Sequence, residues 1–252
     1  MTGHHIVNAL TMTEVKVQFG ETVVLEDVTA SLAAGTLVGV VGPNGAGKST
    51  LFNAIAGLVP LAEGEVLIHG LPPDRARGRL AYVPQKEDIN WRFPLTAGEV
   101  VMLGRVHKGK RLIKSSSNDR HFVDECLNRV GMWDMRNDLV SELSGGQRQR
   151  VFVARALAQE ADILLLDEAF SGVDFASQDA LIGALRDLRN EGKTILLATH
   201  DLTKLSDRFD TVLCINRHVC AVGPPATAFT PQVLEELYGA HGVSFSEGGH
   251  NH

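Results

Sequence analysis

One segment constrains the fold of this chain more than any other, and it reads Gly42-Pro43-Asn44-Gly45-Ala46-Gly47-Lys48-Ser49-Thr50. It matches the phosphate-binding pattern G-x-x-x-x-G-K-[ST]. Residues 36–41 before it predict a buried strand, and residues 51–56 after it predict a helix. Glycines let the backbone approach phosphate oxygens, where N–H groups and the helix N-terminus favour negative charge. This order of elements predicts a phosphate-binding site on an α/β fold.

Two side chains of this loop carry specific expectations. Lys48 can reach the terminal phosphates of a nucleotide, and the Ser49 hydroxyl can ligate magnesium. The alternative is a glycine-rich turn that matches the pattern by chance. The flanking strand and helix argue against that alternative.

A second segment, Leu143-Ser144-Gly145-Gly146-Gln147, begins a predicted helix that runs to about Ala158. Val151, Ala154 and Ala158 fall at helical spacing and give this helix an apolar face. Ser144 is the expected N-cap, and the two glycines leave backbone donors uncovered. The segment is therefore a second candidate for anion binding, although a capped surface helix would explain it equally well on its own.

An apolar run at residues 163–166 ends in two carboxylates, Asp167 and Glu168. Such a run predicts a strand of a parallel sheet that is buried on both faces. We expect Asp167 to hold magnesium, directly or through water, and Glu168 to orient or deprotonate an attacking water. Adjacent carboxylates are costly unless a cation or a catalytic task compensates, so a simple helix N-cap is the weaker interpretation.

With these motifs in this order, the chain resembles the nucleotide-binding subunit of an ATP-binding cassette (ABC) transporter. The resemblance covers about residues 11–225 and includes smaller motifs. Gln85 follows a strand-like stretch, as the family's glutamine loop does, and His200 stands in the place of the switch histidine. Residues 171–174 match the dimer-contacting aspartate loop. Phe19 matches the aromatic residue that stacks on adenine, although a core aromatic is an alternative interpretation of that ring.

The resemblance implies ATP and Mg²⁺ as ligands and assigns roles to named residues. Catalysis would involve Glu168 as general base together with His200, Gln85 and Lys48. The nucleotide would contact Phe19, Gly42 to Thr50, Ser144, Gly145, Gly146, Gln147 and Asp174. Magnesium would be held by Ser49, Gln85 and Asp167.

The expected fold is a P-loop NTPase (RecA-like) α/β core with a parallel sheet, an N-terminal antiparallel β subdomain and an inserted helical subdomain. Short strands are expected at 14–19 and 28–32, and alternating strands and helices from residue 161 onward favour a parallel, doubly wound sheet. The polar and basic stretch 107–117 is expected to be an exposed loop.

The whole chain is expected to form a single ABC ATPase domain. Its parts would be a nucleotide-binding core at 11–85 and 161–225, a helical signature subdomain at 86–160 and a C-terminal extension at 226–252.

Composition limits the possible classes of protein. The chain has 252 residues, of which 44% are hydrophobic and 21% charged, as in a soluble globular domain. No apolar run approaches the ~18 residues that span a bilayer, and residues 1–5 lack the basic and apolar regions expected of a secretory signal. The 3 scattered cysteines indicate a reducing compartment, and a net charge of -6 argues against nucleic-acid binding. We expect a peripheral protein on the cytoplasmic face of the cell membrane.

Further segments resemble the cassette subunits of manganese, zinc or iron importers. These are Trp91-Arg92-Phe93-Pro94, the later Gly104-Arg105, and residues 167–174, where that group usually has Pro in place of Ala169. The resemblance implies a homodimer that encloses two ATP, each between the phosphate loop of one copy and the Ser144 segment of the other. It also implies an integral-membrane permease and, indirectly, a substrate-binding protein.

Other functions of a cassette ATPase fit the sequence less well than import. A cassette ATPase that acts on a cytosolic scaffold, such as iron–sulphur cluster maturation, would share every ATP motif, but residues 91–94 argue against it. Cassettes that act on DNA or ribosomes usually carry two cassettes or a coiled-coil insertion, and exporters more often fuse the cassette to membrane helices. The histidines His241, His250 and His252 could bind a divalent ion, but a flexible tail is the favoured interpretation.

Overall fold

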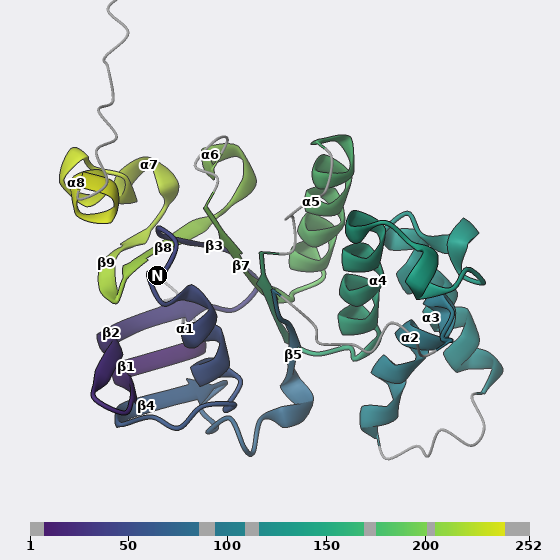
Figure 1. Ribbon diagram of the computed structural model, residues 1–252, viewed down its shortest axis with the longest axis horizontal. Coiled ribbons are helices and arrows are strands. Elements are labelled where there is room, and N and C mark those ends of the chain that lie inside the picture. The colour runs from purple at the N-terminus through teal and green to yellow at the C-terminus, as the bar shows by residue number, and fades with distance from the viewer. Residues whose placement is uncertain (1–7, 86–93, 109–115, 169–174, 201–204, 240–252) are drawn as a thin grey trace, which may run out of the picture.

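The computed structural model describes residues 8–85, 94–108, 116–168, 175–200 and 205–239. Two sheets face each other across helix α1 (Lys48–Ile55), and a group of helices extends from one end of the larger sheet (Figure 1). None of the described helices is both long enough and apolar enough to cross a membrane.

The smaller sheet is antiparallel and has the order β2-β1-β4. It consists of β1 (Asn8–Phe19), β2 (Thr22–Ala33) and β4 (Glu63–Ile68). The strands expected at 14–19 and 28–32 are confirmed, but both are longer than expected. Strand β4 was not expected, because its exposed N-terminal half does not show a clear apolar alternation.

The larger sheet has the order β5-β6-β7-β3-β8-β9. Its strands are β5 (Leu80–Val83), β6 (Ile163–Asp167), β7 (Thr194–Thr199), β3 (Leu37–Val41), β8 (Thr211–Asn216) and β9 (His218–Gly223). The strands from β5 to β8 are parallel, as expected. The expectation fails at β9, which pairs antiparallel with β8. Only Arg217 joins these two strands, and so short a connection forms a hairpin.

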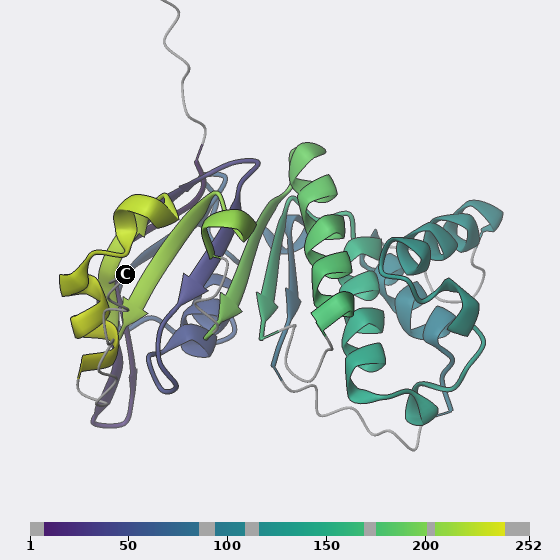
Figure 2. The ribbon, with the colours of Figure 1, turned by 90° about the horizontal axis from the view of Figure 1, so that it is seen from above.

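Two groups of helices lie at opposite ends of the molecule (Figure 2). One group contains α2 (Ala97–Leu103), α3 (Ser117–Arg129) and α4 (Gly145–Ala158), with short 3-10 turns at Gly104–Lys108, Trp133–Met135 and Val140–Glu142. The other contains α7 (Pro225–Ala228) and α8 (Pro231–Tyr238), which follow β9. Helix α5 (Phe175–Asn190) and the short α6 (Leu205–Arg208) lie along the larger sheet, and a 3-10 turn at Arg77–Arg79 precedes β5.

Three helices begin with a capping box, in which the N-cap side chain and the side chain three residues later exchange hydrogen bonds with each other's backbone. The pairs are Thr96 with Glu99, Ser116 with Asp119, and Ser144 with Gln147. The second pair corrects the expected loop at 107–117, because helix α3 already begins at Ser117. Most of that stretch, residues 109–115, lies outside the described residues.

Two hydrophobic cores lie on opposite faces of the larger sheet. Helix α1 fills the space between the two sheets with Leu51, Phe52 and Ile55, which are fully buried. The Phe52 ring meets Tyr82 of β5 edge to face, with ring centroids 6.3 Å apart. The packing of α1 therefore fixes where its N-terminus, and the loop before it, stand relative to the larger sheet.

Truncation of Phe52 tests this packing. We expect Phe52→Ala to lower the free energy of unfolding by about 3–5 kcal/mol, because it leaves a cavity between two sheets. Leu58→Ala is the control, since Leu58 is 64% exposed and its loss should change stability by less than about 0.5 kcal/mol. Urea denaturation of both variants measures the difference, and equal small losses would contradict the assigned role of α1.

Candidate functional site

Four neighbouring strands of the larger sheet end at one edge, and each is followed by polar residues. Strand β3 leads into the phosphate loop, β5 into Gln85, β6 into Glu168 and β7 into His200. The carboxyl ends of parallel strands form the usual ligand-binding edge of an α/β sheet. A cavity of about 460 Å³ opens here and is lined by Val24, Asn44, Gly45, Gly47, Lys48, Ser49, Thr50, Gln85, Glu168 and His200.

The backbone of the phosphate loop is held against the β8–β9 turn. A Cβ atom on Gly42 would lie 2.1 Å from the carbonyl oxygen of Ile215, so only glycine fits there. The Arg217 N–H donates to the Ala46 carbonyl oxygen at 2.9 Å. Gly45 and Gly47 have φ angles of 81° and 96°, which favour glycine. A Cβ on Gly45 would meet no atom within 4 Å, so the loop is open on that side.

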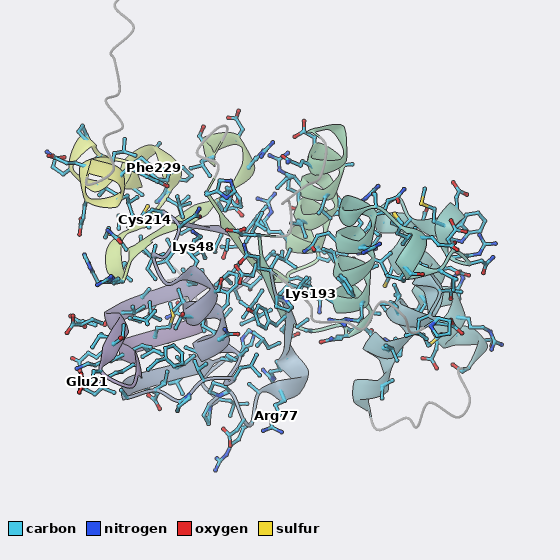
Figure 3. The ribbon with its side chains drawn as sticks, in the orientation of Figure 1. Glu21, Lys48, Arg77, Lys193, Cys214 and Phe229 are labelled. Carbon is cyan, nitrogen blue, oxygen red and sulfur yellow. The ribbon has the colours of Figure 1, made fainter. Side chains whose placement is uncertain are left out.

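Lys48 is the first residue of α1 and folds back over the loop. Its Nζ donates to the carbonyl oxygens of Gly42 at 2.7 Å and Pro43 at 2.9 Å. The side chain is buried, and this burial lowers the pKa of Lys48, although Glu168 and Asp167 act in the opposite direction. Gly47 gives α1 no side-chain cap, so the positive end of the helix is available to an anion. Figure 3 shows Lys48 in the interior of the molecule, between the two sheets.

Asp167 ends β6 with a buried carboxylate that is 1% exposed. Burial raises the pKa of this carboxyl, while a hydrogen bond with Ser49 and the charge of Lys48 lower it. The Tyr82 hydroxyl lies 3.5 Å from Oδ2, whereas Oδ1 is buried and has no hydrogen-bond partner among the described residues. An unpaired carboxylate oxygen beside a hydroxyl is a donor set that suits a hard cation such as Mg²⁺, so these residues fit the expected ion.

Glu168 stands between Gln85 and His200. Gln85 Nε2 donates to its Oε2 at 2.5 Å, and His200 Nδ1 lies 3.9 Å from its Oε1. The Glu168 backbone has a φ of 50°, which is uncommon for a residue with a side chain and often marks a functional position. Gln85, Glu168 and His200 therefore line the same cavity as Lys48, the fourth side chain expected to act in catalysis.

Two other parts of the expected nucleotide site, Phe19 and residues 144–147, do not line this cavity. The Phe19 ring, at the end of β1, is 51% exposed and is available for stacking, but it does not line the cavity. Ser144 is the N-cap of α4, as expected, yet none of residues 144–147 lines the cavity. Asp174 lies outside the described residues, as do residues 91–93, Ala169 and the terminal histidines.

Two residues near the site were missed in the sequence. Val24 contributes an apolar wall from β2, and Tyr82 places its hydroxyl beside Asp167. Tyr82 lies in the stretch before Gln85 that was expected to be a strand. Its hydroxyl, a polar group in an otherwise apolar strand, was the only sign in the sequence of a role at the site. Burial and the Asp167 charge both raise the pKa of Tyr82, so it stays protonated at neutral pH.

The buried Asp167 charge predicts a change in stability without any ligand. Because the folded-state pKa is raised, the free energy of unfolding falls as the pH rises from the ordinary aspartate value through the raised one. We therefore expect Asp167→Asn to be more stable than the parent at pH 7 and to lose this pH dependence. Thermal unfolding at several pH values, with no nucleotide or divalent ion, measures both effects.

Asp162→Asn is the matched control for this measurement. Asp162 immediately precedes β6, and its side chain is 47% exposed at 3.7 Å from Lys193. Its loss should change the free energy of unfolding by less than about 0.5 kcal/mol. A less stable Asp167→Asn protein would mean that Lys48 outweighs burial, and the account of this carboxylate would be wrong.

Comparisons with known proteins agree on one family. Residues 25–171 match the family described as ABC transporter. The zinc transport system ATP-binding protein TroB of Treponema pallidum is 43% identical, over 86% of this chain and 81% of that protein. The manganese transport system ATP-binding protein MntB of Bacillus subtilis is 42% identical, over 89% and 90%.

An iron-related protein and a solved structure also match. The chelated iron transport system membrane protein YfeB of Yersinia pestis is 45% identical, over 84% of this chain and 73% of that protein. An inward-facing ABC transporter of the metal-chelate type superposes with a TM-score of 0.80 and 25% identity, covering 92% of this chain and 89% of that one.

Proposed function

The chain belongs to the ABC transporter family, and we propose that it is the ATP-hydrolysing subunit of an importer for a divalent metal ion. The observation that carries the ATPase half is the meeting of Lys48, Gln85, Glu168 and His200 at one cavity beside an uncapped helix start. The metal half is supported by relatives named for zinc, manganese and chelated iron transport. The metal would pass through a separate permease and would not contact the nucleotide site.

Hydrolysis would proceed by attack of water on the γ-phosphorus, with release of ADP and phosphate. Glu168 would accept the proton from the attacking water, and His200 would contact the γ-phosphate. Lys48 would exchange its two carbonyl partners for phosphate oxygens, while the backbone N–H groups of the loop hold the other oxygens. Ser49, Gln85 and Asp167 would hold Mg²⁺, which neutralises phosphate charge when it is bound.

The site would be completed by a second copy of the chain. Residues 144–147 do not line the cavity, although the Gly145 and Gly146 N–H groups, which the Ser144–Gln147 capping box does not use, are suited to a phosphate. A two-fold dimer would bring this segment of one copy against the phosphate loop of the other and enclose two ATP. Phe19 would stack on adenine, and Asp174 would link the two sites across the interface. Hydrolysis would then loosen the contact that the γ-phosphate makes with both copies.

The proposed location follows from the same scheme. The protein would sit on the cytoplasmic face of the membrane, held by an integral-membrane permease. A substrate-binding protein on the other side would select the metal.

Removal of the proposed base tests the chemistry. We expect Glu168→Gln to bind ATP as the parent does, to lower the turnover rate by about 10²–10⁴-fold, and to elute as an ATP-bound dimer. Phosphate release and size-exclusion chromatography with ATP and magnesium measure these outcomes. Glu125→Gln is the control, because Glu125 is an exposed partner of His121 and should leave the rate unchanged. A Glu168→Gln protein that hydrolyses ATP at the parent rate would rule out this assignment.

A second experiment tests the transport role. Tagged Glu168→Gln protein is purified with ATP and magnesium from detergent-solubilised membranes of its own host, and co-purifying proteins are identified. We expect a polytopic permease. Recovery of only cytosolic scaffold proteins, ribosomes or DNA would overturn the transport proposal while leaving the ATPase proposal intact.

A further inference from the structure

A second group of potential metal ligands lies outside the nucleotide site. It consists of His218 and Cys220 on β9 and Glu236 on α8, whose ligand atoms all lie within 4.8 Å of one another. We refer to these three residues as the β9–α8 cluster. In Figure 3 two labelled residues help to locate the cluster: Cys214 lies on β8, the strand next to β9, and Phe229 follows α7.

The fold brings these three side chains together for separate reasons. His218 and Cys220 flank Val219 on β9, at a bulge where the register with β8 shifts by one extra residue. Helix α8 packs on β8 and β9, and the Asn216 side chain donates to the Glu236 carbonyl oxygen at 3.0 Å. His218 Nε2 lies 2.5 Å from Glu236 Oε1 and 4.0 Å from Cys220 Sγ. Strand β9 thus holds His218 and Cys220 together, and the packing of α8, with its hydrogen bond from Asn216, adds Glu236.

We propose that the β9–α8 cluster binds a divalent cation of the zinc class and that the phosphate loop responds to its occupancy. Imidazole and thiolate ligands favour Zn²⁺ over Mg²⁺, Ca²⁺ or Mn²⁺. Three protein ligands leave a fourth tetrahedral position to water. The ligand atoms of a tetrahedral zinc site lie about 3.3–3.6 Å apart, so His218 and Glu236 must separate by about 1 Å, and the Cys220 sulfur, 4.0 Å from His218 Nε2, must move closer. The His218 and Glu236 side chains are 49% and 42% exposed, so part of each faces solvent and has room for this movement.

Metal binding at the cluster exchanges bonds in a simple way. The metal forms one bond each with an imidazole nitrogen, a carboxylate oxygen and the sulfur of Cys220. The S–H bond of Cys220 breaks, and its proton leaves to solvent. The proton between His218 Nε2 and Glu236 Oε1 also leaves, so the neutral ring carries its one N–H on Nδ1, and two metal bonds replace this contact.

A short path connects the cluster to the phosphate loop. Arg217, which immediately precedes His218, donates its N–H to the Ala46 carbonyl oxygen and accepts from the Glu26 N–H, both at 2.9 Å. Its φ is 66°, a conformation that few residues with side chains adopt, so this turn has little freedom to relax. A metal that joins β9 to α8 would therefore restrain the turn that holds the loop. A role in sensing imported metal rests on the proposed function, whereas metal binding itself does not.

Cobalt titration of the full chain tests the site. In every sample His4, His5, His241, His250 and His252 are replaced by alanine, so that the terminal histidines contribute no signal. We expect one equivalent of Co²⁺ to give a thiolate-to-cobalt charge-transfer band that Zn²⁺ displaces. Cys220→Ser should abolish this band, and His218→Ala and Glu236→Gln should each weaken Co²⁺ affinity at least about tenfold.

Two controls address other thiols and histidines. Cys126→Ser removes a buried thiol from the helical group, and His121→Ala removes an exposed histidine paired with Glu125. Both should leave the titration unchanged, and melting curves verify that every variant is folded. Absence of the band in the parent, or its persistence in Cys220→Ser, would overturn the metal site.

A second titration tests the response of the loop. The affinity for a fluorescent ATP analogue is measured with and without one equivalent of Zn²⁺, in the parent and in Cys220→Ser. The change measured with Cys220→Ser shows how much of the effect comes from Zn²⁺ that binds the nucleotide directly. We expect a change of at least about fivefold in the parent alone. Equal affinities in the parent would overturn the coupling and leave the metal site standing.

Discussion

The phosphate loop can hold its shape only because another part of the chain fixes its backbone. Gly42 lies against the Ile215 carbonyl oxygen, and the Ala46 carbonyl oxygen accepts from the Arg217 N–H. The sequence separation between these partners is large, so the loop depends on correct assembly of β3 beside β8. These two contacts fix the phosphate loop. The loop in turn determines where α1 begins, where Lys48 points and where the cavity opens.

Charge explains why the site is poised for a ligand. Without a ligand, Lys48 donates hydrogen bonds to two loop carbonyl oxygens, and Glu168 accepts one from Gln85. One oxygen of the Asp167 carboxylate, Oδ1, has no hydrogen-bond partner among the described residues. Each of these contacts is one that a nucleotide and a hard cation can replace with a stronger, charge-assisted one. Apart from Asp167 Oδ1, these polar groups therefore have partners in the free protein, and Lys48, Gln85 and Glu168 line a single cavity.

Sequence patterns predicted the parts of the fold that depend on local signals. The apolar runs of β3, β6 and β7 and the capping residue Ser144 were read correctly, because burial and capping leave marks in a few neighbouring residues. Strand β4 and the antiparallel β9 were missed, since pairing partners and sheet order depend on distant segments. Tyr82 was not predicted as a neighbour of Asp167, because β5 and β6 are far apart in the sequence.

In the candidate site, too, features with a local sequence signal were predicted and features that depend on distant segments were not. The family resemblance implied that Lys48, Gln85, Glu168 and His200 act together, and the structure brings these four side chains to one cavity. The contact of Arg217 with the loop and the β9–α8 cluster carried no local signal, because His218 and Cys220 gain a third ligand only when α8 packs on β9.

A mixing experiment tests the central claim that two copies complete each ATP site. It uses Lys48→Ala, which damages the loop, and Gly145→Asp, which places a carboxylate at the α4 start where a Cβ meets no atom within 4 Å. Both variants carry Glu168→Gln, and retained ATP is counted after size-exclusion chromatography. Each alone should stay monomeric and retain little ATP, whereas the mixture should form dimers with one ATP, at the one site built from two intact halves. A mixture that gains nothing, or a Gly145→Asp monomer that retains ATP, would contradict the two-copy site.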